Sequence, residues 1–282
     1  MLRKKQIVID WADDNPVVVL PAGTALSGKF KLETSRTVTI RKLLAAGDSN
    51  AKLAKSNKAQ DVYKTFGLTL APAGLADIGN MCGNNSIACT DYCLDGSGMR
   101  AVYENIHLSK IARTWLFRYY RSWFINQLAR ELDNKQTHAK RNNYIAAIRL
   151  NVMSDWPFET TGIIDQFPAI QFYDYSKHLK RAGLLRPNYW VTFSRSESNQ
   201  RATMAALISG HNVAVVFADS NGGPRRPLAL PESYKGYDVI NGDLTDLRFL
   251  DRRGVVVGLK LKTHTIAQYQ AACATGFPVL VN

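Results

Sequence analysis

Short apolar runs recur along the chain after residue 60, separated by segments of helical or loop character. Their length and their content of β-branched and aromatic residues are typical of strands buried on both faces, as in a parallel sheet. A sheet of this many strands, wound in one direction, closes most readily as a (β/α) barrel. The seven runs are Tyr63–Leu70, Tyr144–Asn151, Ile170–Tyr175, Tyr189–Ser194, Val213–Ala218, Tyr237–Ile240 and Val255–Leu261.

The sequence therefore predicts an α/β fold, a complete or partial (β/α) barrel of about six to eight mostly parallel strands. An open doubly wound sheet is the alternative. No GxGxxG motif follows the first run, which counts against a dinucleotide-binding sheet.

Between Ser97 and Lys140 apolar residues return every three or four positions, which predicts two consecutive helices or one long bent helix. Arginines alternate here with aromatic residues such as Trp115 and Trp123, a mixture also found where proteins bind single-stranded nucleic acid. We interpret the aromatic residues as core and the arginines as the exposed half of an amphipathic helix.

The first part of the chain differs in character. Four short β-like runs, punctuated by Pro and Gly, lie at Gln6–Asp10, Val17–Leu20, Lys29–Glu33 and Thr37–Arg41. Gly47–Ser56 is rich in Gly, Asn, Ser and Lys without the spacing of a phosphate loop, and we interpret it as a solvated loop. We therefore divide the chain into a β-rich basic appendage, residues 1–60, and a barrel-like domain, residues 61–282.

The net charge of +13 changes the picture of possible partners, because such a surface attracts polyanions. A nucleic acid or a nucleotide is the first partner to consider, and a basic surface without a specific partner is the alternative. Residues 36–64 carry seven basic residues against two acidic ones and form a candidate phosphate-contacting segment. No apolar run has the length of a membrane span, so we expect a cytoplasmic protein without a membrane partner. The oligomeric state is left open.

Candidate chemistry is concentrated in a loop after the first predicted strand, which contains Cys82, Cys89 and Cys93. A disulfide would leave one thiol unpaired and is rare in an intracellular protein. A structural zinc site needs a fourth ligand, and neither Cys273 nor His107 completes a familiar spacing. Three thiolates can hold an iron–sulfur cluster with one iron open to a small molecule. The sequence thus favours a cluster and leaves zinc and unmetallated thiols open.

Polar residues also follow several of the predicted strands. Because the carboxyl ends of parallel strands meet at one edge of a sheet, these residues are candidates for holding a cofactor or substrate. Each has an ordinary alternative, such as turn formation, or helix capping for the Ser-Glu-Ser-Asn run that contains Glu197. Arg149, inside an apolar strand, needs an acidic partner if it is buried. The candidates are Asn151, Asp155, Asp174, Ser194 and Glu197.

The segment CGNNSIACTDYCL resembles the cysteine segment of the gene product 88-like proteins of phages and prophages. Further similar segments, among them IRLNVMSDWPFE (148–159) and DVINGDLTDLRFLDRRGVVVGLKLK (238–262), extend the resemblance over most of the chain after about residue 43. One departure is Gly83, where the resemblance implies proline. A cysteine loop after the first strand of an α/β barrel is also similar, by position and not by spacing, to the radical S-adenosylmethionine enzymes.

Two hypotheses follow. The first is a phage-type iron–sulfur protein, with a 4Fe–4S cluster and S-adenosylmethionine as cofactors, acting on a nucleotide or nucleic acid. The second is a basic nucleic-acid-binding phage protein with a structural zinc or no metal and no catalysis. A hydrolase is a weaker third, because the sequence shows no Ser–His–Asp order and no paired-histidine metal motif.

Overall fold

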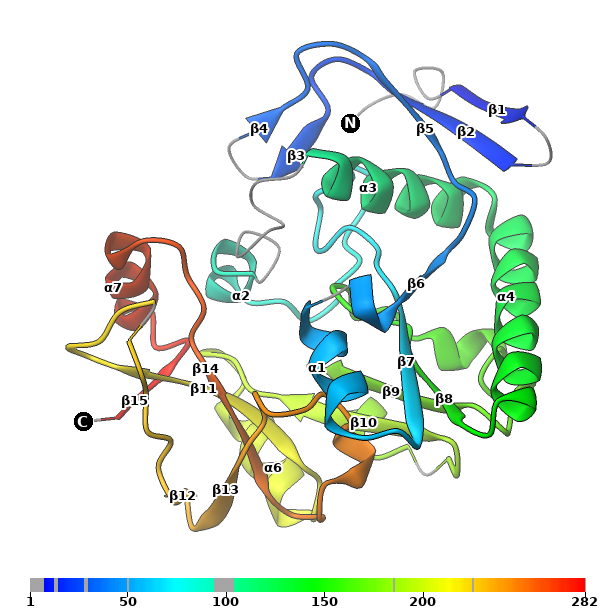
Figure 1. The fold of residues 1–282 in the computed structure, drawn as a ribbon. Helices are drawn as coiled ribbons and strands as arrows, with labels where there is room; N and C mark the ends of the chain where they lie inside the picture. Colours follow the sequence, from blue (N-terminus) through cyan, green and yellow to red (C-terminus); the bar gives the residue numbers. More distant parts are fainter. Residues whose placement is uncertain are drawn as a thin grey trace.

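The computed structural model describes residues 8–12, 15–27, 30–49, 51–93, 104–184, 186–224 and 226–281. Its largest feature is a curved sheet of ten strands (Figure 1). Hydrogen-bonded neighbours follow the order β12, β13, β14, β11, β10, β9, β8, β7, β6, and β15 pairs with β11 outside this path. The strands are β6 (Leu44–Ala46), β7 (Tyr63–Leu68), β8 (Ile145–Arg149), β9 (Gln171–Ser176), β10 (Tyr189–Ser194), β11 (Val213–Asp219), β12 (Ser233–Tyr234), β13 (Tyr237–Asn241), β14 (Val256–Lys260) and β15 (Val279–Val281).

Seven consecutive strands of this sheet, from β7 to β13, are parallel, and they are the seven predicted from the apolar runs. The short strands β6 and β12 pair antiparallel at the two edges. The prediction of an α/β fold with a mostly parallel sheet is therefore confirmed. Among the described residues no ladder joins β6 to β12, and a closed barrel is not shown.

Two long helices, α3 (Glu104–Tyr119) and α4 (Arg121–Arg141), cover the outer face of the sheet near β7 and β8. Trp115 and Phe124 are fully buried and belong to the same core as Ile148 of β8. The interpretation of the aromatic residues as core is thus confirmed for Trp115, and residues 97–103 of the predicted helical region lie outside the described ones. The shorter helices are α2 (Ile87–Asp91), α5 (Leu179–Ala182), α6 (Gln200–Ile208) and α7 (Ile266–Ala274), with 3-10 turns at Gly47–Ser49, Phe158–Thr161 and Arg248–Leu250.

The concave face of the sheet holds a helix, α1 (Ala51–Ala59), where the sequence predicted a solvated loop over Gly47–Ser56 (Figure 1). That prediction was wrong. Leu53 and Ser56, three positions apart, are fully buried, and Leu53 packs in one cluster with Tyr173 of β9. Only one large apolar residue faces inward, so the hydrophobic period of this helix is too weak to be recognised in the sequence.

This helix spans the opening between the two ends of the curved sheet. It packs on β7 near one end, and it contacts the loop after β13 near the other. Ser56 Oγ accepts a hydrogen bond from the Asp246 backbone N–H at 2.7 Å, and Lys55 Nζ donates to the Asp243 carbonyl at 3.3 Å. A helix thus fills the gap that strand pairing fills in a closed barrel.

A buried ion pair crosses the same concave face. Arg149 Nη1 of β8 donates to Asp246 Oδ2 at 2.9 Å, and the Tyr175 hydroxyl donates to Asp246 Oδ1 at 3.2 Å. The Arg149 guanidinium also lies over the Tyr175 ring, 4.6 Å from its centroid. The prediction that Arg149 needs an acidic partner is confirmed, because both members of the pair are buried.

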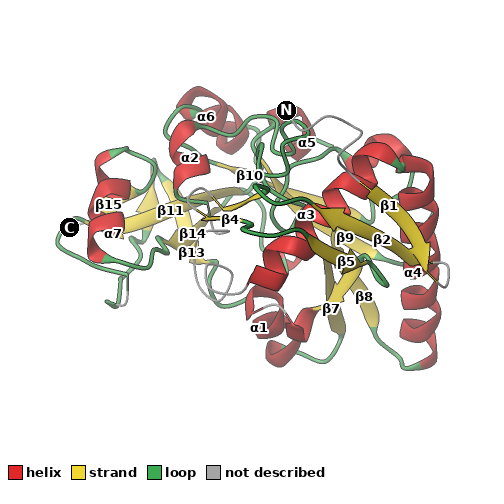
Figure 2. Ribbon diagram, turned by 90° about the horizontal axis from the view of Figure 1, so that it is seen from above, coloured by secondary structure: helices red, strands yellow, loops and turns green. Residues whose placement is uncertain are grey.

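Antiparallel strands of the first part of the chain lie over α3 (Figures 1 and 2). The sheet β1-β2-β5 buries Val18 and Leu20 in the core that contains Ile111 of α3. Trp11 packs edge-on against Trp123 of α4, with ring centroids 5.4 Å apart. The β-rich character predicted here is confirmed, although residues 6 and 7 of the first predicted run lie outside the described part. The strands are β1 (Val8–Ala12), β2 (Asn15–Leu20), β3 (Ala25–Ser27), β4 (Phe30–Lys31) and β5 (Arg36–Thr39).

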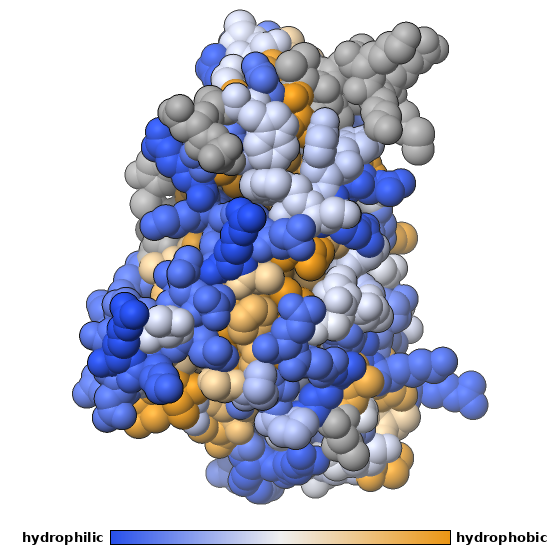
Figure 3. Space-filling view, turned by 90° about the vertical axis from the view of Figure 1, so that its right-hand side faces the viewer, coloured by the Kyte–Doolittle hydropathy of each residue, from blue (hydrophilic) through white to orange (hydrophobic). Residues whose placement is uncertain are grey.

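The surface seen from the side of α4 is mostly hydrophilic, with hydrophobic side chains gathered near its middle (Figure 3). Within the described residues, no helix combines the length and the apolar character that crossing a membrane requires.

We predict that Asp246→Asn lowers the free energy of unfolding by about 3–5 kcal/mol, because it leaves the Arg149 charge buried without its partner. Urea denaturation followed by circular dichroism measures the change. The double variant Arg149→Met/Asp246→Asn is expected to recover part of the loss.

The matched control is Asp238→Asn, which removes an exposed ion pair with Arg252 and is expected to cost less than about 1 kcal/mol. Equal losses for Asp246→Asn and Asp238→Asn would contradict the importance of the buried pair.

Candidate functional site

The segment that follows β7 runs across the carboxyl edge of the parallel sheet and is fixed there by hydrogen bonds. The Thr114 hydroxyl accepts from the Ala71 backbone N–H at 2.8 Å, and Trp115 Nε1 donates to the Ala76 carbonyl at 2.8 Å. The Asp155 backbone N–H donates to the Met81 carbonyl at 2.9 Å. Helix α3 and the loop after β8 therefore determine where Cys82 lies.

Cys82 is largely withdrawn from solvent within this segment. Its sulfur accepts a hydrogen bond from the Ala73 backbone N–H at 3.0 Å and lies 3.6 Å from the Met153 carbonyl oxygen. The pKa of the Cys82 thiol is raised to about 11, mainly by burial and also by Cys89, while the Ala73 N–H and Lys177 act in the opposite direction. Cys82 and Cys89 thus influence each other electrostatically.

The backbone conformation of Gly83 explains why the position after the first cysteine is not proline in this chain. Its φ is +46°, which the proline ring, fixed near −65°, does not allow. A Cβ atom here would stand 2.6 Å from His178 Nε2. The next residue, Asn84, places its Nδ2 2.9 Å from His178 Nδ1, so the loop packs closely on the residues after β9.

Cys89 lies on the short helix α2, and Glu197 holds the first turn of that helix. Glu197 Oε2 accepts from the Ser86 hydroxyl at 2.7 Å, and Oε1 accepts from the Ala88 backbone N–H at 3.1 Å. Ser86 in turn is the N-cap and accepts from the Cys89 N–H at 3.2 Å. The structure thus places Glu197, a predicted ligand-binding residue, as the anchor of the cysteine helix.

Lys177 reaches the two thiols from the end of β9. Its ammonium group interacts electrostatically with the Cys89 thiol and lies 3.5 Å from the Ser194 hydroxyl. Burial lowers the pKa of Lys177, but Cys89, Asp155 and Cys82 together outweigh this effect, and the pKa is raised. Sequence reasoning did not select Lys177; its position directly after a predicted strand was the available signal.

Cys93 follows the Tyr92 C-cap of α2 and is half-buried, and its backbone N–H donates to the Thr90 carbonyl at 3.4 Å. No disulfide links the four cysteines, all of which are described. In the described part of the chain, no three Cys, His, Asp or Glu side chains converge as ligands of one metal ion. Cys82 and Cys89 both act electrostatically on Lys177, and the described residues do not show Cys93 as a third ligand beside them.

The Asp155 carboxylate is used in contacts within the protein that support the site, and it does not line the site itself. Its Oδ2 accepts from the Lys177 backbone N–H at 2.8 Å and from the Ser176 hydroxyl at 3.1 Å, and its Oδ1 pairs with Arg181. Arg181 also forms a two-point pair with Glu159, at 2.6 and 3.0 Å. These contacts fix the backbone that carries Lys177.

Asn151 and Asp174, two further predicted ligand-binding residues, are sealed in the interior with each other. Asp174 accepts from the Asn151 backbone N–H at 2.8 Å, from Asn151 Nδ2 at 3.0 Å and from the Tyr189 hydroxyl at 3.1 Å. Burial raises the pKa of Asp174 to about 6, although Arg181 and Arg149 act in the opposite direction. Ser194, another of the five candidates selected from the sequence, is linked to the thiols through Lys177.

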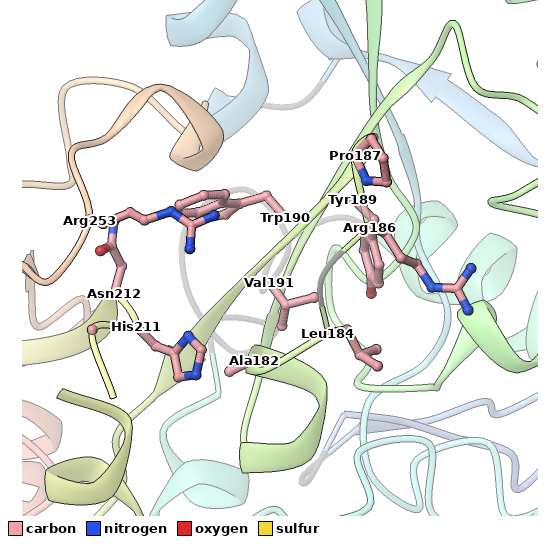
Figure 4. Close-up of a pocket in the computed structure, with 11 residues that line it drawn as sticks. Ala182, Leu184, Arg186, Pro187, Tyr189, Trp190, Val191, His211, Asn212 and Arg253 are labelled. Atoms are coloured by element: carbon pink, nitrogen blue, oxygen red, sulfur yellow. The ribbon is translucent and has the colours of Figure 1, made fainter. Parts of the chain in front are cut away.

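A cavity of about 290 Å³ lies at the opposite edge of the sheet, around the amino end of β10 (Figure 4). The Arg253 guanidinium lies over the Trp190 ring, 5.2 Å from its centroid, and His211 lines the same space. In parallel α/β folds this edge usually serves stability, and ligands bind at the carboxyl ends of the strands. We therefore place the candidate site at the cysteines.

Comparison with known families gives one match. The sequence profile of the family described as gene product 88 matches residues 41–276. The matched region begins two residues after β5 ends, so it contains every strand of the ten-stranded sheet except β15, together with α1 and the cysteine loop. No curated protein and no solved structure is significantly similar to the chain.

We predict that Asp174 gives the fold a pH dependence of the opposite sign to that of a salt-bridged carboxylate. Its raised pKa means that the folded state binds a proton more tightly than the unfolded state does, so its contribution is greatest below the ordinary pKa of 3.8 and is lost as pH rises through about 6. Urea midpoints of the wild type and Asp174→Asn, compared at pH 4 and pH 7, measure this contribution.

The urea midpoint of the wild type, relative to that of Asp174→Asn, should be higher at pH 4 than at pH 7. A constant difference at both values would show that Asp174 has an ordinary pKa.

Proposed function

The chain belongs to the gene product 88 family, and on that premise we propose that it is an iron–sulfur enzyme whose cluster is held by Cys82, Cys89 and Cys93. The observation that carries the proposal is the electrostatic coupling of Cys82 and Cys89 with each other and with Lys177, which directly follows β9 at the carboxyl edge of a curved parallel sheet. Open positions for chemistry in parallel α/β folds are found at this edge.

The donor chemistry of the loop supports this choice. All three cysteines are half-buried in the same loop, and thiolates are the usual protein ligands of iron–sulfur clusters. Cys93 lies two residues after Asp91, the last residue of the five-residue helix α2. In the proposed holoprotein, the backbone after Thr90 would rearrange and turn the Cys93 thiol toward Cys89, so that cluster binding completes the set of three ligands.

Lys177 would act on the thiols electrostatically. A nearby ammonium group stabilises the thiolate, which is the form that binds metal. The lysine is held in place from two sides, since its backbone N–H is bound by Asp155 and its ammonium group lies near Ser194.

When bound, a three-thiolate cluster would supply an open iron for a small co-substrate, which we propose to be S-adenosylmethionine, and an electron for its reduction. Lys177 and Ser194 are the polar side chains next to the thiols and would orient that co-substrate. Asp155 and Glu197 would act as positioning residues, because their carboxylates are already bound to Lys177, Arg181 and the start of α2. A nucleotide or nucleic acid is the substrate that the basic surface favours.

Anaerobic purification tests the proposal directly. We expect a brown protein with about four irons and matching sulfide per chain. Cys82→Ser, Cys89→Ser and Cys93→Ser should each reduce the iron content strongly, whereas Cys273→Ser, which changes the fourth cysteine outside the loop, should retain it.

A colourless protein with stoichiometric zinc, or equal iron in all four variants, would overturn the cluster. The variant Lys177→Met offers a second readout. It should retain iron, and its absorption spectrum should respond to added S-adenosylmethionine differently from that of the wild type.

A second candidate function is nucleic-acid binding without turnover. It is favoured by the excess of basic residues, since the chain has 36 Lys and Arg against 23 Asp and Glu. The basic segment 36–64 is divided among several elements: Arg36 on β5 pairs with Glu104, Lys64 on β7 lies over Tyr144, and Lys55 is on α1.

For this candidate we predict affinity for single-stranded oligonucleotides that falls at least tenfold between about 50 and 200 mM salt. The triple variant with serine at all three loop cysteines should bind equally well. Fluorescence anisotropy measures both, and the absence of binding at the lower salt concentration would exclude this candidate.

A further inference from the structure

A cavity of about 350 Å³ lies at the carboxyl edge of the sheet. Asn241 and Lys260, which line it, are the last residues of β13 and β14, and Gly223 and Pro224 follow β11. The cavity therefore stands at the carboxyl ends of three neighbouring strands, where α/β folds place ligands. Its volume lies within the usual range for small-molecule sites.

Four cationic side chains and one carboxylate line this cavity. The carboxylate, Asp243, is occupied: its Oδ1 accepts from Lys262 Nζ at 2.7 Å and its Oδ2 accepts from the Lys260 backbone N–H at 2.9 Å. Lys55 reaches the same place from α1 and donates to the Asp243 carbonyl. Asp243 thus holds two lysine side chains at the cavity, through its carboxylate and its carbonyl.

The other two cations have no acidic partner within the described part of the chain. Among the described residues, neither the Lys260 side chain nor Arg226 forms an ion pair, and Arg226 donates only to the Asn221 carbonyl at 3.1 Å. A cavity with four cations and one neutralised carboxylate has a strong excess of positive charge. An anion with more than one negative charge fits this excess best.

One wall of the cavity is apolar. Leu228, Leu244 and Leu261 line it, and Leu244 is 68% exposed although it is a large apolar residue. A free inorganic anion would make no use of such a wall. An anionic ligand with an apolar or aromatic body would cover it.

The cavity and the cysteine loop both contact one buried apolar cluster. Leu261 and Tyr269, which line the cavity, are members of one buried cluster, and Tyr92 packs against that cluster. Tyr92 directly precedes Cys93. A ligand in the cavity would therefore lie close to the loop that carries the thiols.

We propose that this cavity binds a small phosphate monoester with an aromatic body, of the size and chemistry of a nucleoside monophosphate. Lys55, Lys260 and Lys262 contact the phosphate, and the leucine wall contacts the base. This inference goes beyond the proposed cluster, because binding at these residues needs no metal.

Isothermal titration calorimetry on the full chain tests it, with the four common ribonucleoside monophosphates and their nucleosides as probes. At least one monophosphate should bind with a Kd below about 1 mM, and the matching nucleoside at least about tenfold more weakly, because it lacks the charged hydrogen-bond acceptor. Lys55→Gln/Lys260→Gln should weaken the monophosphate about tenfold or more.

The matched control is Lys58→Gln/Lys140→Gln. Lys58 lies one turn from Lys55 on α1, and Lys140 is an exposed residue of α4; neither lines the cavity. This variant should keep the wild-type affinity within about twofold. The proposal is overturned if no monophosphate binds, if the nucleoside binds as well as its monophosphate, or if both double variants weaken binding equally.

Discussion

The buried ion pair between Arg149 and Asp246 is the interaction on which the shape of this protein depends. The two side chains are only 6% and 1% exposed, and charges withdrawn from water to this degree are tolerated only when they are paired and hydrogen-bonded. Arg149 is on β8, the third strand from the β6 edge, and Asp246 is in the loop after β13, the second strand from the β12 edge. Their pairing therefore requires the sheet to curl, and α1 fills the space that the curl encloses.

The same curvature gathers the carboxyl ends of β8, β9 and β10 around the segment that follows β7. Two candidate residues there are each held by a second residue. Glu197 holds the helix of Cys89, and Asp155 holds the backbone of Lys177. These contacts fix the candidate site on the side of the strands.

The seven parallel strands could be predicted because each buries an apolar run on both faces, and that pattern is local. Helix α1 could not, since its burial comes from one leucine and from serine and lysine contacts with a distant loop. The roles of Asn151 and Asp174 were equally hidden: their position at strand ends was visible, whereas their mutual hydrogen bonds depend on tertiary packing. Gly83 shows the reverse case, in which a departure from the family pattern has a direct cause in a positive φ and a close histidine.

The acids at this edge of the sheet have a consequence for its ligands. Asp155 and Glu159 are bound by Arg181, Asp174 by Asn151 and Tyr189, and Glu197 by the start of α2. Each of these four carboxylates is used to fix the fold, so none of them is free to receive a cationic ligand. An anionic ligand would instead meet ammonium groups beside the cysteines, at Lys177, and in the leucine-walled cavity, at Lys55, Lys260 and Lys262. Among the described residues, the contacts at this edge of the sheet therefore favour an anionic ligand over a cationic one.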